Sequence, residues 1–285
     1  MSTTVRLYHF PLSYESQIVR VVLCEKGLRS EERLIDPGPP YRSYEPWYLR
    51  LNPRGRVPTL EHQGRILTDA VEIARYLDGR FPGPALVPGD PARRRTVEEW
   101  VALQRGLPSL DLTYACLGGL LRRAALHDFA RRRRRLSHLR RRHPGLAASF
   151  DRILEDLDDW EASIRDAALL TALMEELGQA LDRLEARLGG RNWILGDRYS
   201  LADVVWGVAL ARFDLVRLAH LWERGRRPDI DAYYARFKGR ACFRRAGVVN
   251  RHDPGLVVPA VLRAARAPLA GVAFAGAVGV LMAAM

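Results

Sequence analysis

Residues 52–82 read NPRGRVPTLEHQGRILTDAVEIARYLDGRFP, and this stretch decides the fold. Proline has no amide hydrogen, so Pro58, at the entrance of the apolar run 57–60, suits the first residue of a strand or the turn before it. A cis bond between Val57 and Pro58 would hold the backbone N–H and C=O of Val57 outward, where they can pair with another extended peptide. The dipeptide is therefore a candidate peptide-binding edge.

The rest of the stretch predicts two short strands and a helix. A strand follows Pro58, a turn falls at His62-Gln63-Gly64, and Ile66-Leu67 forms the second strand. Thr68-Asp69 then opens a helix whose apolar face is formed by Val71, Ile73, Ala74 and Leu77. The free N–H groups and positive potential at a helix start favour a carboxylate.

This order of motifs resembles a known family. The series NPRGRVPTL, an acidic residue opening a helix, IARYL and a Phe-Pro stop is similar to the second half of the thioredoxin-like domain of glutathione transferases. Further motifs resemble the ganglioside-induced differentiation-associated branch of that superfamily: Tyr8-His9-Phe10, Ser13, Ser16-Gln17, Val19-Arg20, Glu25-Lys26-Gly27-Leu28, Glu45-Pro46-Trp47, Arg50-Leu51-Asn52, Leu201-Ala202-Asp203-Val204, Arg227-Pro228 and Tyr233-Tyr234. The resemblance covers most of the chain and implies an α/β thioredoxin-like N-terminal domain followed by an all-α helical bundle.

We expect four parts along the chain. Residues 1–82 form the thioredoxin-like domain, with a strand at 5–8, a helix from Ser13 or Ser16 to Leu28 and a strand at Leu34-Ile35. The proline-rich residues 83–92 form a linker, residues 93–253 a helical domain with a basic insert at 122–145, and residues 254–285 an apolar tail. Long helices are predicted over 93–126 and 146–188, with a leucine seam at 170, 173, 177, 181, 184 and 188.

Composition restricts the class of protein. At 285 residues, with 48% hydrophobic and 27% charged residues, the chain is long enough for two modest globular domains. Cys24, Cys116 and Cys242 are widely separated and form no CxxC pair, so we expect buried thiols in a reducing compartment, with neither a disulfide framework nor a metal site. The first strand starts at once after residues 1–4, which leaves no signal peptide and indicates a cytoplasmic protein.

The net charge of +12 is concentrated in one segment. Of 45 basic residues only Lys26 and Lys238 are lysine, which indicates a coding bias more than phosphate recognition. Residues 122–143 hold ten arginines against the single acid Asp128. Such a block is usually a solvated loop or helix face. The lack of interleaved aromatic residues argues against binding of nucleic acid, and an anionic membrane surface is the better partner.

Two further motifs concern folding and location. Ser200 and Asp203 have the spacing of a capping box, with Tyr199 packing on Val204, and in the resembled family such a box starts the central buried helix. Residues 268–285 carry no charge and span about 27 Å as a helix, against a hydrocarbon core of roughly 30 Å. The resemblance favours a tail anchor with the folded domains in the cytosol, and an Ala/Gly-rich helix packed on the domain is the competing interpretation.

The resemblance implies glutathione as co-substrate. A free thiol titrates near about 8.5, and a hydroxyl donor at a helix start lowers that value by favouring the thiolate. Ser13 is the predicted catalytic hydroxyl, with Ser16, Tyr8 and Tyr14 as substitutes. The competing interpretation of Ser13 is an ordinary helix N-cap.

The resemblance also predicts how the tripeptide binds. The backbone of Val57 next to Pro58 would pair with the cysteinyl part, and Asp69 and Ala70 match the acid-Ser pair that holds the γ-glutamyl end. Ala70 replaces the serine, so one hydroxyl hydrogen bond is lost and binding is expected to be weaker by about 1 kcal/mol or more. Arg56, together with Arg54, would add charge for the glycyl carboxylate. The competing interpretation of Asp69 is a carboxylate that accepts from the amides of its own helix start.

Two functions therefore compete. The first is a homodimeric glutathione transferase that conjugates or reduces small hydrophobic electrophiles. Ser13, Pro58 and Asp69 favour this first function. The second is a membrane-anchored module of the same fold, with a degenerate tripeptide site and a basic insert that contacts lipid or a partner protein. Ala70 and the arginine block favour this second function.

Overall fold

The computed structural model describes residues 5–116 and 119–251. The apolar tail predicted at 254–285 lies outside the described residues. Within the described ranges, no helix combines the length and the apolar character that crossing a bilayer requires.

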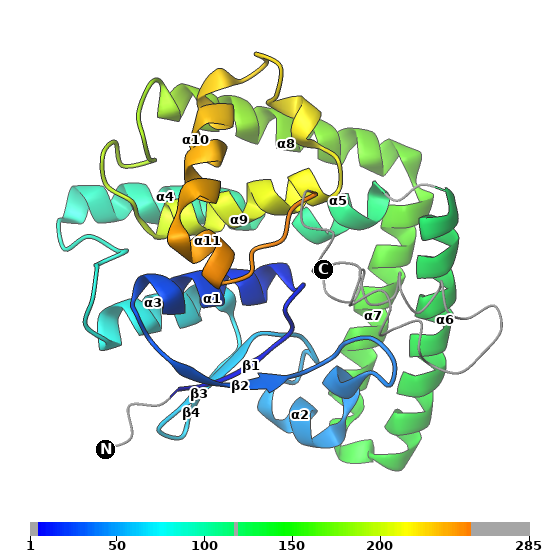
Figure 1. Ribbon diagram of the computed structural model, residues 1–285. Coiled ribbons are helices and arrows are strands. Elements are labelled where there is room, and N and C mark those ends of the chain that lie inside the picture. The colour runs from blue at the N-terminus through cyan, green and yellow to red at the C-terminus, as the bar shows by residue number, and fades with distance from the viewer. Residues whose placement is uncertain (1–4, 117–118, 252–285) are drawn as a thin grey trace.

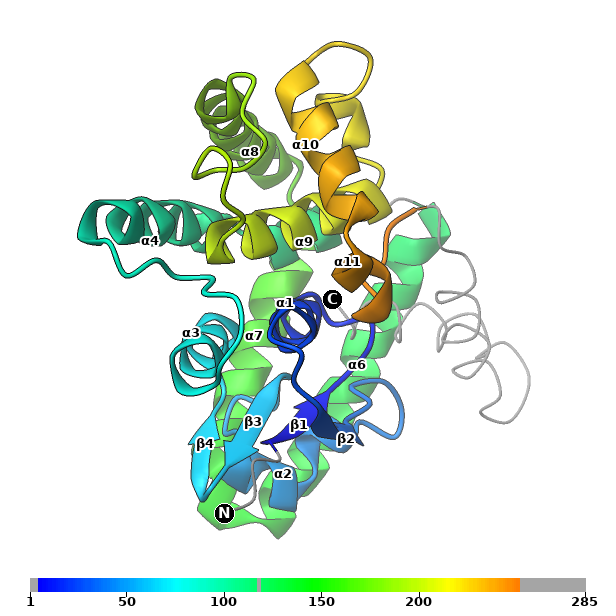
Figure 2. The same cartoon turned by 60° about the vertical axis from the view of Figure 1, so that its left-hand side comes forward.

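The N-terminal domain is built on a four-stranded mixed sheet. Its strands are β1 (Val5–His9), β2 (Ser30–Leu34), β3 (Thr59–His62) and β4 (Arg65–Leu67), in the order β2-β1-β3-β4. β1 pairs parallel with β2 and antiparallel with β3, which places the buried Leu7 opposite Leu60. Helices α1 (Tyr14–Glu25) and α3 (Ala70–Arg80) cover one face and α2 (Pro46–Leu51) the other (Figure 2). The predicted thioredoxin-like fold is therefore confirmed.

The second strand lies earlier than predicted. The sequence analysis placed it at Leu34-Ile35, but β2 occupies Ser30–Leu34, with sequence SEERL. Its side chains are half-buried or exposed because it is an edge strand that pairs only with β1. A strand held by backbone hydrogen bonds at a sheet edge needs no apolar alternation, so the pattern could not show it.

The linker is held by one buried carboxylate. Asp78, near the end of α3, accepts hydrogen bonds from the amides of Leu86 and Val87, both at 2.9 Å. Lys26 places its ammonium 3.1 Å from the same carboxylate and 3.2 Å from the carbonyl of Pro84. The chain therefore leaves the sheet domain along a fixed path and enters α4 at Pro91.

The C-terminal domain is helical. It contains α4 (Pro91–Gly106), α5 (Ser109–Ala115), α6 (Gly119–Arg142), α7 (Ala147–Arg165), α8 (Ala167–Leu188), α9 (Leu201–Leu215), α10 (Pro228–Gly239) and α11 (Ala241–Arg245) (Figure 1). Short 3₁₀ helices are η1 (Arg42–Tyr44) in the first domain, and η2 (Pro144–Leu146) and η3 (Ala219–Leu221) in the second. All predicted seam leucines are buried except the half-buried Leu170.

The two long helices predicted over 93–126 and 146–188 are broken into shorter ones. Pro108 ends the first helical segment, because a proline cannot donate to the helix ladder. Asp166 separates α7 from α8 and caps α8 by accepting from the amides of Ala168 and Leu169 at 2.8 and 3.1 Å. A capping aspartate inside a long helical pattern is a weak signal in sequence.

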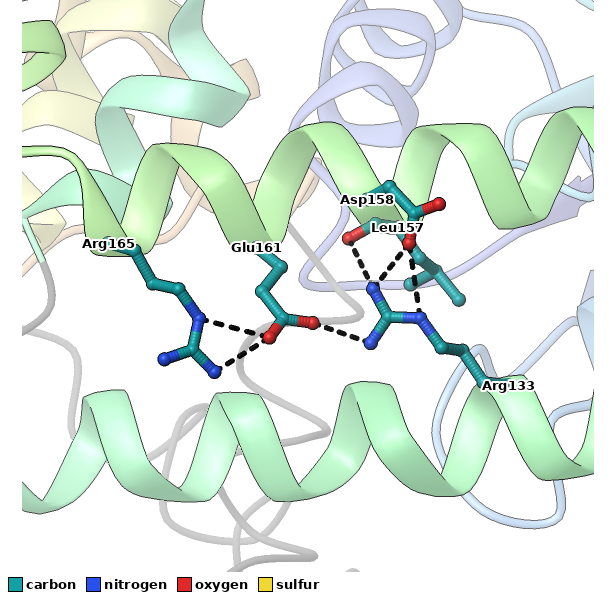
Figure 3. Close-up of polar contacts among 5 residues, drawn as sticks. All are labelled: Arg133, Leu157, Asp158, Glu161 and Arg165. Carbon is teal, nitrogen blue, oxygen red and sulfur yellow. Dashed lines mark hydrogen bonds and ion pairs between the residues drawn. The ribbon is translucent and has the colours of Figure 1, made fainter.

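The arginine block is helical and partly engaged inside the protein. Arg133 of α6 donates to Asp158 and to Glu161 of α7, and Glu161 also accepts from Arg165, as Figure 3 shows. Arg140 pairs with Asp151 in the same manner. Of the two forms expected for this block, a loop or a helix face, the structure shows a helix, and the acidic face of α7 compensates part of the charge that α6 carries.

The α6 and α7 pair extends along the sheet domain (Figures 1 and 2). The two helices share a buried cluster with the segment around η1 and α2, formed by Tyr41, Tyr44, Leu49, Tyr114, Ala125, Phe129, Leu136, Leu139, Phe150, Ile153, Leu157 and Ile164. This cluster fixes the basic insert against the first domain and so adds a wall to the space between the domains.

Helix α9 is buried along nearly its whole length. Asp203 in its first turn accepts from the amides of Ile194 and Ser200 at 2.9 and 2.8 Å, and from the hydroxyl of Ser200 at 2.8 Å. Gly207 lies against Phe237, and a Cβ at this position would approach that ring to 2.5 Å. The helix start and the close approach of α10 therefore depend on these two residues.

We expect Asp203→Ala to lower the free energy of unfolding by about 3 kcal/mol or more, because three buried donors would lose their acceptor. Denaturant unfolding followed by circular dichroism measures this change. The exposed Asp197 provides a matched control, and Asp197→Ala should stay within about 0.5 kcal/mol of the unaltered protein. A loss below about 1 kcal/mol for Asp203→Ala would contradict the structural role of this carboxylate.

One sequence prediction about the cysteines was wrong. Cys24 at the end of α1 and Cys242 in α11 form a disulfide, although 218 residues separate them. The neighbouring Glu25 and Arg240 form an ion pair at 2.7 Å across the same junction. The pairing escaped sequence analysis because only the folded chain brings the end of α1 to α11. Cys116 is a free thiol, and burial raises its pKa.

Alkylation tests this pairing. Protein purified without reductant and denatured in iodoacetamide should take up one label, on Cys116, and should take up three labels after prior reduction. Intact-mass spectrometry counts the labels. Three labels before reduction would show that Cys24 and Cys242 are both thiols.

Candidate active site

A cavity of about 340 Å³ lies between the two domains. It is lined by the starts of α1 and α3, by the loop that leads into β3, and by residues of η1, α4, α5, α6, α7 and α9. Ser13, Val57, Asp69 and Ala70 all lie on its wall. Residues predicted from three separate parts of the sequence are therefore brought to one place.

Ser13 is the N-cap of α1. Its hydroxyl oxygen accepts from the amide of Ser16 at 3.3 Å and donates to the carbonyl of Val57 at 3.4 Å. Both hydrogen bonds are long, and the side chain is 5% exposed. The N-cap contact uses a lone pair of the hydroxyl, so the O–H of Ser13 can exchange its long hydrogen bond to Val57 for one to a ligand in the cavity.

Val57 presents its backbone to the cavity. The Val57-Pro58 peptide bond is cis, and Pro58 immediately precedes β3. Within the described part of the chain the amide of Val57 donates no hydrogen bond, and its carbonyl accepts only the long bond from Ser13. An extended peptide laid against this edge would find one donor and one acceptor.

Asp69 has a second role at the start of α3. One of its oxygens caps the helix by accepting from the amides of Val71 and Glu72 at 3.0 and 2.9 Å. The carboxylate is also bound through both oxygens by the guanidinium of Arg105, at 3.1 and 2.7 Å. The amide of Ala70, as the first of the helix, has no acceptor within α3. The helix start keeps its donors, and the aspartate already has a cationic partner.

The two arginines near Val57 differ in environment. Arg54 is exposed at the cavity wall. Arg56 pairs with Asp156 at 2.8 Å, and its guanidinium lies 5.2 Å from the ring centroid of Trp160. Arg56 is therefore half-buried and engaged, and of the two arginines Arg54 is the one that can approach an incoming carboxylate without breaking such a contact.

Two of the three substitute hydroxyls lie away from the cavity. Tyr8 donates its hydroxyl to Glu61 at 3.0 Å beside the aromatic rings of Trp47 and Tyr48, and Ser16 is buried in α1 with its oxygen near the amide of Phe10. Tyr14 does line the cavity. Burial raises the pKa of Tyr14 above its ordinary value, so its hydroxyl stays protonated and can donate a hydrogen bond to a ligand.

Several cavity residues were not predicted. Arg212 of the central helix α9 lies at the wall and donates to the carbonyl of Leu12 at 2.7 Å. Burial lowers the pKa of Arg212 to about 10, so the side chain keeps its positive charge at neutral pH. The remaining unpredicted wall includes Glu15, Tyr44, Gln104, Arg105, Tyr114, Arg132 and Trp160. Their positions in helical segments give no local motif that sequence analysis could have used.

Among the described residues, no cluster of three or more His, Cys, Asp or Glu side chains suits a metal ion. The donors at the cavity are hydroxyls, backbone amides and guanidinium groups. Such groups bind carboxylates and stabilise a thiolate.

Comparison with known proteins agrees with this arrangement. Residues 7–85 match the model of the glutathione S-transferase N-terminal domain, and residues 167–236 match that of the C-terminal domain. These matches cover more than half of the chain, which therefore belongs to the glutathione transferase superfamily. The resemblance predicted from the sequence is confirmed.

Curated relatives extend over nearly the whole chain. The tetrachloro-p-hydroquinone reductive dehalogenase of Sphingobium chlorophenolicum is 28% identical, over 88% of this chain and 99% of the relative. The maleylacetoacetate isomerase of Pseudomonas aeruginosa is 31% identical, over 87% and 98%. The human ganglioside-induced differentiation-associated protein 1-like 1 is 28% identical, over 90% and 77%.

Solved structures show the same fold. The β-etherase LigF of a Sphingobium species aligns with a TM-score of 0.68 at 23% identity, covering 86% of this chain and 98% of that one. A theta-class glutathione S-transferase of Xanthomonas axonopodis, solved with glutathione bound, aligns with a TM-score of 0.61 at 20% identity, covering 87% and 98%. At these identities the likeness concerns the fold alone.

Proposed function

We propose that this protein is a glutathione-dependent enzyme that joins the glutathione sulfur to small electrophiles. The observation that carries the proposal is that Ser13, Val57 and the start of α3 line one cavity. The cysteinyl backbone of glutathione would pair with Val57, its γ-glutamyl carboxylate would meet the amide of Ala70, and its sulfur would lie near Ser13.

The chemistry needs a thiolate held beside an electrophile. The positive end of α1, a hydrogen bond from the Ser13 hydroxyl and the charge of Arg212 would each favour the anionic sulfur. The thiol proton would pass to water. The thiolate sulfur then forms a bond to the electrophilic carbon, and the leaving group departs with the electron pair of the broken bond. No further reactant is required.

The names of two relatives support a small electrophile that carries oxygen groups as substrate. These names contain tetrachloro-p-hydroquinone and maleylacetoacetate, which are both small molecules that carry oxygen groups. A cavity of about 340 Å³ has the size of a pocket for glutathione's reactive end with one small molecule. We extend this substrate class to the present protein as part of the proposal.

A catalytically weak module of the same fold is the second candidate. The observation in its favour is the bidentate contact of Arg105 with Asp69, since the amino group of glutathione would have to share this carboxylate. Ala70 removes a hydroxyl from the same spot. Three further properties are predicted from the sequence alone. They are membrane anchoring through residues 268–285, homodimer formation and contacts of the basic insert with lipid.

Measuring glutathione binding distinguishes the two candidate functions. The variant Ala70→Ser adds a second test, because it should bind glutathione more tightly than the unaltered protein. We expect the full chain to bind glutathione at millimolar concentration or below, and Ala70→Ser to bind about tenfold more tightly, because one hydrogen bond to a carboxylate is gained. Isothermal titration calorimetry measures both. Ala92→Ser on the exposed start of α4 is the matched control and should change nothing. If no variant releases or absorbs heat with glutathione, the enzyme function is excluded and the catalytically weak module remains.

Ser13→Ala tests the catalytic assignment. With glutathione and chlorodinitrobenzene, we expect kcat/KM to fall by roughly 10- to 100-fold while the glutathione Kd stays within about twofold, because the hydroxyl acts on the sulfur. Loss of the N-cap should also cost about 1 kcal/mol of stability. Ser16→Ala removes a neighbouring buried hydroxyl outside the cavity and should preserve turnover. The reverse pattern would identify Ser16 as the wrongly rejected hydroxyl.

A further inference from the structure

Arg132 brings a guanidinium from the arginine block to the cavity wall. The residue lies in α6 and is 3% exposed. Its Nε donates to Asp128 at 2.6 Å, and its Nη1 donates to the hydroxyl of Tyr44 at 3.0 Å. Asp128 is held in turn by the hydroxyl of Tyr41 at 2.8 Å. The guanidinium is therefore fixed in position before any ligand arrives.

This wall also contains polar groups whose hydrogen bonding is incomplete. The Nη2 of Arg132, the Nε of Arg56 and the hydroxyl of Ser43 are buried and have no partner among the described residues. All three residues line the cavity. Each group can donate a hydrogen bond, and leaving a buried donor unpaired costs about 1–3 kcal/mol. A ligand with acceptor oxygens would satisfy them.

The neighbouring side chains favour a flat ligand. Tyr114 and Trp160 stack with centroids 5.5 Å apart and an interplanar angle of 28°, and both line the cavity with Tyr44. Arg56 covers the ring of Trp160. Aromatic walls of this kind pack against planar molecules.

The acidic residues around the cavity limit the electrostatic attraction that this wall exerts on an anion. Asp128 pairs with Arg132 and Asp156 pairs with Arg56, so the two guanidinium groups add no net positive charge. Glu15, Asp69 and Asp111 also lie on the cavity wall, where Arg54, Arg105 and Arg212 oppose them. Recognition of an anionic oxygen would therefore depend on directed donors more than on bulk potential.

We propose that this wall binds the anionic oxygen of a planar electrophile, a carboxylate or a phenolate, with Arg132 as the residue that determines this specificity. The inference rests on the proposed function, because the glutathione thiolate is the attacking group. On a chlorinated ring, the sulfur bonds to the carbon that carries chlorine, the C–Cl bond breaks, and chloride leaves with the electron pair. Arg132 takes no part in these bonds and positions the ring.

The test compares two probes, chloronitrobenzoate and its methyl ester, which has no charge and carries one additional methyl group. We expect the full chain with glutathione to show a kcat/KM for the benzoate at least tenfold higher than for the ester. In Arg132→Met the preference should disappear through a higher KM for the benzoate, with the value for the ester within about twofold of its original. Equal use of both probes by the unaltered protein would overturn the inference.

Removing Arg132 alone leaves the buried Asp128 without its cationic partner, which endangers folding. The double variant Asp128→Asn, Arg132→Met removes both charges and should fold while still losing the preference for the benzoate. Arg135→Met, an exposed arginine on the same helix, is the matched control and should keep that preference. If the double variant folds and retains it, Arg132 is not the determinant.

Binding measurements separate this inference from the proposed function. Calorimetry of the benzoate and the ester without glutathione tests the wall directly, and tighter binding of the benzoate that depends on Arg132 supports the inference even if no turnover occurs. Glutathione affinity is measured on the same variants. A loss of glutathione binding in the double variant, with unchanged benzoate binding, would assign Arg132 to a carboxylate of the tripeptide and overturn the inference.

Discussion

The burial of α1 between the sheet and α9 is the constraint on which the arrangement of the two domains depends. Ile18, Val19 and Val22 of this helix belong to a core that continues without a break into the helical domain. At the start of α1, Arg212 of α9 holds the carbonyl of Leu12, and at its end Arg240 holds Glu25. The position of Ser13 is therefore set from both domains at once.

Much of the fold and part of the candidate site could be predicted because local chemistry determines them. Pro58 before a short apolar run and Asp69 before an apolar helical face specify their strand and helix through backbone geometry and capping. The candidate site residues at the beginnings of these elements could be identified in the same way: Ser13, Val57, Asp69 and Ala70. The contacts of Arg105, Arg132 and Arg212 with the cavity arise from packing between distant helices, so neither spacing nor periodicity identifies them.

The arginine content has two physical consequences that composition alone cannot separate. Arg133 and Arg140 meet the acidic face of α7 and hold the insert together, whereas Arg134, Arg135, Arg141 and Arg142 are exposed. Pairs of this kind at the surface contribute about 0–1 kcal/mol each. The apolar cluster between α6, α7 and η1 must therefore supply most of the stability of the insert, and the ion pairs fix its register.

The wall formed by η1, α6 and α7 makes the two halves of this chain mutually dependent. Tyr41, Tyr44 and Leu49 of the first half are covered by side chains of the second. A hybrid that carried the first half without α6 and α7 would expose these three side chains to water and lose one wall of the cavity. Exchange of parts among members of the superfamily would here require η1 and the α6–α7 hairpin to be inherited together.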